Sequence, residues 1–241
     1  MKKIIFLLLW LPWLSSAQFK DLVQKATQKV SHPKSVTSPV DVAGGLKEAL
    51  NRGITNQVTK LTALDGFYKN ETVKILMPSE LQKVDNTLRQ MGMGALADEG
   101  IKALNRAAED AVKEATPIFV SSIQSMSFKD AKLILLGNDT AATTYLKSTT
   151  SAALYSKFAP VVQKSIGKVG ADQIWASLIK KYNGLPFVSK VNPDITDYVT
   201  SKAMEGVFTM IAIEEKNIRG SSVARTTDLL KKVFALQDKK Q

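Results

Sequence analysis

The stretch PDITDYVTSKAMEGVFTMIAIEEKNIRG, residues 193–220, carries the longest helical pattern of the chain. Its apolar residues recur mostly three or four positions apart, the spacing of one face of an α-helix. They are Ile195, Tyr198, Val199, Ala203, Val207, Phe208, Ile211 and Ile218. Pro193-Asp194 is a helix start and Gly220 a helix end. Because so wide an apolar face needs partners on several sides, we predict a long central helix near residues 194–219.

The same spacing continues upstream and predicts further helices. Leu46, Leu50, Ile54, Val58 and Leu61 share one face of a helix that begins near residue 41. Two further helices are expected, one beginning at Ser79 and one over residues 95–115. Thr116-Pro117 begins a helix that ends at 126, and the cap Ser127 begins one that ends at 137. Three more helices are expected over residues 138–148, over 150–169 from Thr150 with a break or kink at Pro160, and over 171–182. A last helix begins at Thr226 or Thr227.

These patterns predict an all-α fold, because alternating apolar and polar runs bounded by hairpin turns do not stand out. We expect one bundle-like domain of about nine to ten helices over residues 41–236. Residues 18–40 are expected to form a short helix at 19–30 and a polar linker, and residues 237–241 a frayed tail.

The first 17 residues have the pattern of a signal peptide. Lys2 and Lys3 precede an apolar run, and Ser15-Ser16-Ala17 offers a small-residue cleavage site after Ala17. The apolar run covers Ile4 to Leu11, and even Ile4 to Leu14 is only 11 residues and includes Pro12, whereas a membrane-spanning helix needs about 20. We therefore expect a periplasmic or secreted protein with no transmembrane segment in its mature chain.

The composition is basic and free of cysteine. The formal net charge is +11, and no residue is available for a disulfide or for a cysteine-linked lipid anchor. For an exported chain, an excess of lysine favours lipid or another anionic envelope component as partner over nucleic acid. The basic residues are scattered, so solvated helix faces are the simplest interpretation.

The residue inventory argues against several catalytic chemistries. His32 is the one histidine and lies in the polar linker, which is a poor setting for a catalytic triad. One histidine and no cysteine cannot supply the ligand set of a zinc site, and the glycines form no nucleotide-binding motif, so we expect no metal and no cofactor. Carboxylates remain, but we assign no catalytic residue. Glu215 and Arg219, four residues apart, are expected to form a surface ion pair worth a few tenths of a kcal/mol.

Several blocks of the chain resemble a bacterial family catalogued as domain of unknown function 4197. The blocks are Gly45–Leu50, Leu104–Glu109, Pro117–Phe119, Met126–Gly137, Tyr198–Ala203 and Ala224–Phe234. The resemblance covers residues 42–234 and implies an exported helical protein of Gram-negative-type bacteria with no assigned activity. Members often look like lipoproteins, whereas this chain lacks the cysteine for such an anchor.

Polar residues within these blocks are the candidate ligand-binding residues: Arg106, Glu109, Arg225, Thr227 and Asp228. One interpretation is an interhelical ion pair that fixes helix register, because polar groups inside a bundle need partners. The other is an anion or head-group site at a helix start, where backbone amides and Arg225 converge.

We favour a non-enzymatic protein that binds an apolar or amphipathic, lipid-like ligand or an envelope partner. The seven methionines suit an adaptable apolar pocket, although each also suits an ordinary core. One alternative is a carboxylate-dependent enzyme acting on an envelope polymer, with Glu109 and Asp228 as the acids to test. Another is a structural or assembly protein with an exposed apolar patch.

Overall fold

The structure is a computed structural model that describes residues 39–79, 82–90, 92, 94–168, 194–225 and 233–235, together with residues 180, 183, 184, 186, 190, 228 and 231. These residues belong to one compact unit, residues 38–241. The predicted leader at 1–17, the helix at 19–30 and most of the helix at 171–182 lie outside them.

The described residues form seven helices and contain no β-strand, which confirms the all-α prediction. The helices are α2 (Pro39–Thr62), α3 (Gln82–Gln90), α4 (Gly94–Val112), α5 (Ala115–Ser125), α6 (Phe128–Leu135), α7 (Ala141–Gly167) and α9 (Ile195–Gly220). The count of nine to ten helices is not matched within this part of the chain. One reason is that residues 138–148 and 150–169, predicted as two helices, form one.

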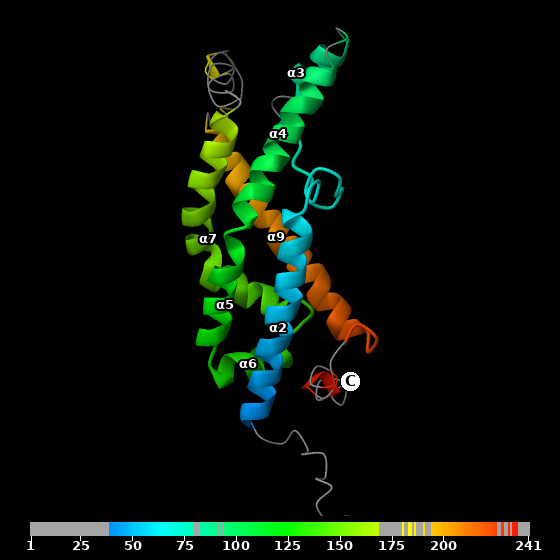
Figure 1. The fold of residues 1–241 in the computed structure, drawn as a ribbon, viewed down its shortest axis with the longest axis vertical. Coiled ribbons are helices and arrows are strands. Elements are labelled where there is room, and N and C mark those ends of the chain that lie inside the picture. The colour runs from blue at the N-terminus through cyan, green and yellow to red at the C-terminus, as the bar shows by residue number, and fades with distance from the viewer. Residues whose placement is uncertain are drawn as a thin grey trace, which may run out of the picture. The chain divides into compact units, whose positions relative to one another are not determined.

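Helix α9 is the central helix that its apolar pattern predicts. It packs against α2, α4 and α7, and Figure 1 shows it running between α7 and α2. The Asp194 side chain accepts hydrogen bonds from the backbone amides of Thr196 and Asp197, so it caps the first turn. Val199, Ala203 and Val207 are fully buried on its inner face.

Helix α7 is continuous through the break that the sequence suggests. The hydroxyls of Thr149, Thr150 and Ser151 donate to the carbonyl oxygens of Tyr145, Leu146 and Lys147, four residues earlier. These side chains therefore bond within the helix and do not cap a new one. Pro160 lies inside the same helix. The prediction of a helix start at Thr150 was wrong, because the hydroxyl side chains fit a helix interior as well as a helix start.

Helix α5 begins two residues earlier than predicted, at Ala115, with Glu114 at the N-cap. Pro117 is thus the third helical residue and not the first. Its missing amide still costs no hydrogen bond, because the first four amides of a helix lack a helical partner.

The main core lies where α9 meets α2, α4, α5 and α7. Phe119 of α5 and Phe208 of α9 meet edge to face, with ring centroids 6.0 Å apart. A side chain at Gly206 would come within 2.7 Å of the Phe67 ring, so glycine lets residues 63–79 approach α9 closely. This connecting segment buries Phe67, Val73 and Ile75 in the core.

A second, smaller core lies under α6. Ala131, Ile134 and Leu135 pack against α2, together with Val233 and Phe234 of the C-terminal segment. Figure 1 shows α6 beyond the end of α5 and beside α2. The cap predicted at Ser127 is present and forms a capping box, because the Ser127 hydroxyl accepts from the Asp130 amide and the Asp130 carboxylate accepts from the Ser127 amide.

Candidate functional site

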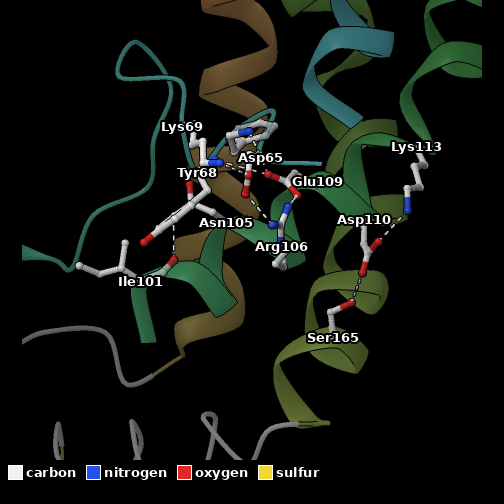
Figure 2. Close-up of polar contacts among 11 residues, drawn as sticks. Asp65, Tyr68, Lys69, Ile101, Asn105, Arg106, Glu109, Asp110, Lys113 and Ser165 are labelled. Atoms are coloured by element: carbon white, nitrogen blue, oxygen red, sulfur yellow. Dashed lines mark hydrogen bonds and ion pairs between the residues drawn. The ribbon is translucent and has the colours of Figure 1, made fainter. Parts of the chain in front are cut away.

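The first polar cluster ties α4 to the segment 63–79. Figure 2 shows the Arg106 guanidinium between the carboxylates of Glu109 and Asp65, and it donates to both. The other Glu109 oxygen accepts from the backbone amides of Phe67, at 3.0 Å, and Tyr68. Both Glu109 oxygens therefore already have protein donors.

Asp65 lies in the turn with which this segment leaves α2. It adopts a positive φ of 67° just after α2, in the left-handed region that aspartate tolerates better than most residues. The Lys69 side chain hydrogen-bonds to its carboxylate, and together with Arg106 it lowers the pKa of Asp65. The charged form of Asp65 therefore stabilises the turn.

Asn105 holds the far end of the same segment. Its side-chain oxygen accepts from the Ile75 amide, and its side-chain nitrogen donates to the Ile75 carbonyl, both at 2.8 Å. The nitrogen also donates to the Ile101 carbonyl of α4. Asn105 thus supplies the two backbone bonds that a neighbouring strand would otherwise offer to buried Ile75.

The second polar cluster centres on Glu215 and Arg219 of α9. Glu215 accepts from the backbone amides of Ala142 and Thr143, each at 2.8 Å, and from the Thr143 hydroxyl. Thr140, the N-cap of α7, makes no capping bond with its own side chain. Glu215 therefore caps α7 from another helix, where a negative charge is favoured.

Arg219 caps the other side of the same junction. It donates to Glu215 and to the carbonyl oxygens of Ile134 and Leu135, at the end of α6. The pair thus provides hydrogen-bond partners for the last carbonyl groups of α6 and the first amides of α7, at the two ends of the segment that connects these helices. Its two side chains are buried, so the expected surface position of this pair was wrong. Spacing alone predicts the pairing but says nothing of burial.

Arg225 closes the end of α9. It donates to the carbonyl oxygens of Ile218 and Arg219, and its guanidinium lies 5.4 Å from the centre of the Phe234 ring. Arg219 approaches the same ring at 5.8 Å. Cation–π contacts therefore help to hold the C-terminal segment on the bundle.

The candidate residues chosen from the sequence do not form one site but lie in different parts of the structure. Arg106 and Glu109 meet within α4, and Arg106 also reaches the segment 63–79, so their pair is not the interhelical ion pair of the first interpretation. Arg225 caps a helix C-terminus. Asp228 pairs with Lys231 at 3.6 Å and is 91% exposed, and Thr227 lies outside the described residues.

One helix face remains exposed although it is largely apolar. We define the α6 face as Phe128, Lys129, Lys132, Leu133 and Leu136. At 100° per residue these five side chains span an arc of about 140°. Leu133 is 63% exposed, and Phe128 and Leu136 are also exposed. Sequence reasoning missed this face, because an apolar run such as residues 133–136 does not reveal which members are buried.

An open groove of about 360 Å³ adjoins the α6 face. It lies between α6 and the start of α7, and Leu133, Ile134, Ala141 and Tyr145 supply most of its apolar lining. Asp130 stands at its edge, and hydrogen bonds from the Ser127 hydroxyl and amide lower the pKa of that carboxyl. The groove therefore joins apolar walls to a fixed polar edge, an arrangement that suits an amphipathic molecule.

A second apolar cleft lies between α2 and α9 and is much smaller. Leu50, Ile54, Ile211 and Phe234 are among its lining residues, and its volume is about 30 Å³. A cavity of 10–15 Å³ holds about one water molecule, so this cleft is too small for an acyl chain.

The described residues offer neither a metal-binding cluster nor a membrane-spanning helix. Within these ranges, histidine and acidic side chains form no group of three or more that is placed to hold a metal ion. Among the described helices none is both long and apolar enough to cross a membrane.

The fold and these clusters define a helical-bundle protein with structural buried charges and an exposed amphipathic face. The chain belongs to the family described as protein of unknown function (DUF4197), whose model matches residues 36–235. Comparison with curated proteins and with solved structures finds no match.

Proposed function

We propose that this chain is a non-enzymatic protein of the cell envelope that binds an amphipathic, lipid-like ligand at its surface. The leader pattern of residues 1–17 supports the location. The binding surface is the α6 face together with the adjoining groove between α6 and α7.

The exposure of the α6 face is the observation that carries this proposal. Phe128 and Leu133 of this eight-residue helix, and Leu136 at its C-cap, are large exposed apolar side chains beside an open apolar groove. Exposed apolar side chains that gather in this way mark binding sites on soluble proteins. The groove has more than ten times the volume of the cleft between α2 and α9, so it is the better place for a hydrocarbon chain.

The buried carboxylates favour binding over hydrolysis. A glycosidase-like enzyme needs two carboxyl groups that face the substrate. Glu109 is saturated by Arg106 and two backbone amides, and Glu215 by Arg219, two amides and a hydroxyl. Each glutamate thus has a structural role that proton transfer would disrupt.

Titration of the isotopically labelled protein with lysophosphatidylcholine tests this proposal. This probe has one acyl chain and no net charge, so it reports binding of an amphiphile without charge attraction. We expect amide NMR shifts that saturate and that concentrate in residues 127–145.

Leu133→Asp should abolish these shifts, because it places a charge between the α6 face and the groove. Leu76→Asp is the matched control, since Leu76 is also an exposed leucine and does not line this groove. Shifts that do not saturate, or that survive Leu133→Asp unchanged, would contradict the proposal.

A further inference from the structure

We infer that the α6 face docks on an anionic phospholipid bilayer, with its apolar side chains among the acyl chains and its two lysines at the phosphates. This inference rests on the proposed function and names the physical form and the charge of its ligand.

The order of residues on the α6 face suits a lipid interface. Phe128, Lys132 and Leu136 follow one another at four-residue steps, and Lys129 precedes Leu133 by the same step on the next ridge. Each lysine therefore has an apolar side chain one turn away. Lysine can lay its hydrocarbon stem along an apolar layer and keep its ammonium group in the polar head-group region.

The two lysine charges are available to an external anion. The ammonium groups of Lys129 and Lys132 have no hydrogen bond and no ion pair within 4 Å among the described residues, although the Lys129 charge helps to lower the pKa of Asp130. The acidic neighbour Asp130 is held by the Ser127 hydroxyl and amide, at 2.6 and 3.0 Å. Asp139, in the turn before α7, is the other acidic residue of this segment.

Helix α6 also has the support that docking requires. Its inner face is fixed to α2 by Ala131, Ile134 and Leu135, and Arg219 holds its last carbonyl groups. Its first turn is fixed by the capping box of Ser127 and Asp130. The exposed side chains therefore stand on a rigid helix, so little conformational entropy is lost on binding.

The net charge of the whole chain favours the same partner. The formal charge of the full sequence is +11, and it is still +9 without Lys2 and Lys3 of the predicted leader, so the protein is attracted to an anionic surface before any contact forms. A bilayer offers an anionic layer and an apolar layer within the reach of one side chain, which matches a face that mixes lysine with phenylalanine and leucine. This charge complementarity distinguishes an anionic bilayer from a neutral amphiphile.

Vesicle flotation tests the inference. The protein is purified from the envelope fraction, its first residue is read by mass spectrometry, and it is mixed with vesicles of phosphatidylglycerol or of phosphatidylcholine. We expect binding to phosphatidylglycerol that is at least tenfold tighter than to phosphatidylcholine and that weakens as salt increases.

The double variant Lys129→Glu/Lys132→Glu should lose at least tenfold in affinity for phosphatidylglycerol, because each lysine near an anionic surface contributes about fivefold. The matched control is Lys157→Glu/Lys164→Glu, which changes the net charge equally at two exposed positions of α7. The control should stay within about twofold of the unmodified chain. Equal midpoints of urea unfolding would show that all variants fold. If charge reversal impairs folding, Lys129→Ala/Lys132→Ala replaces the glutamate variant in the same binding assay.

The outcomes separate the inference from the function on which it rests. Equal loss in both double variants would overturn the inference, since net charge alone would then drive binding. Equal affinity for the two lipids would also overturn it and leave the proposed function standing. Failure to bind any vesicle, together with failure to bind lysophosphatidylcholine, would refute both.

Discussion

Glu215 and Arg219 form an ion pair within α9, with Nη2 and Oε1 2.7 Å apart and with side chains that are only 6% and 2% exposed. Each partner also bonds to a different helix end, Glu215 to the start of α7 and Arg219 to the end of α6. The pair therefore fixes the junction that presents the α6 face and its groove.

Removing one member of this pair should be costly. Glu215→Ala leaves the Arg219 charge buried and two α7 amides without an acceptor, so we expect unfolding to become easier by about 3–5 kcal/mol. Urea denaturation followed by circular dichroism measures this change. The control Glu205→Ala breaks the exposed pair of Glu205 and Lys202 and should cost less than about 1 kcal/mol. Similar losses in the two variants would show that Glu215 has no special role.

Asn105→Leu should loosen the segment 63–79 while the helices stay folded. The substitution keeps the branched shape of the side chain but leaves the Ile75 amide and carbonyl without partners, which costs about 1–3 kcal/mol for each unsatisfied group. Hydrogen exchange at the Ile75 amide should accelerate more than exchange in the inner turns of α9. The exposed helical variant Asn217→Leu should change neither rate, and slow exchange at Ile75 in Asn105→Leu would contradict this assignment.

Two glycines should respond to alanine with opposite signs. Gly206→Ala forces a methyl group to within 2.7 Å of Phe67, so we expect a loss of about 1–3 kcal/mol from overpacking. Gly44, inside α2, has open space around its Cα, so Gly44→Ala should stabilise the chain by up to about 1 kcal/mol. Thermal unfolding of both variants tests the close approach of Phe67 to α9, and a stable Gly206→Ala would disprove it.

Acid should weaken the fold through Asp65 and Asp130. Both have a pKa below the ordinary value of 3.8, Asp65 chiefly because of Lys69 and Asp130 because of Ser127. A carboxylate of this kind stabilises the folded state above its unfolded pKa, and this contribution is lost as pH falls through the lower folded value.

The free energy of unfolding should therefore decline as pH falls below about 4. Asp130→Asn should lower stability at neutral pH and reduce the acid slope. Asp139→Asn, at an exposed position without described hydrogen bonds, should leave the slope unchanged. Urea titrations between pH 2 and 7 provide the comparison, and identical slopes in all three proteins would argue against the capping role of Asp130.

Periodicity predicted the helices well, because helical spacing and capping signals act over a few residues. Ile195 to Gly220 and the capping box of Ser127 and Asp130 were predictable in this way. The continuity of α7 was not, since a threonine hydroxyl can cap a new helix or bond back to the preceding turn.

Residue spacing predicted the site less well, because burial depends on contacts between distant parts of the chain. Arg106 and Glu109 were chosen as paired polar residues, but the backbone amides of Phe67 and Tyr68 that complete the cluster lie 42 and 41 positions before Glu109. The α6 face escaped notice for the same reason. Its apolar residues look like core in the sequence, and only the packing of Ile134 and Leu135 against α2 leaves Leu133 outside.

Hydrogen exchange of the purified protein, with and without phosphatidylglycerol vesicles, is the sharpest test of lipid docking by α6, because it reports on the whole backbone at once. We predict slower exchange in residues 127–145, which cover α6 and the groove, and unchanged exchange in residues 63–79. Protection confined to other segments, or no protection of α6 at saturating lipid, would contradict it.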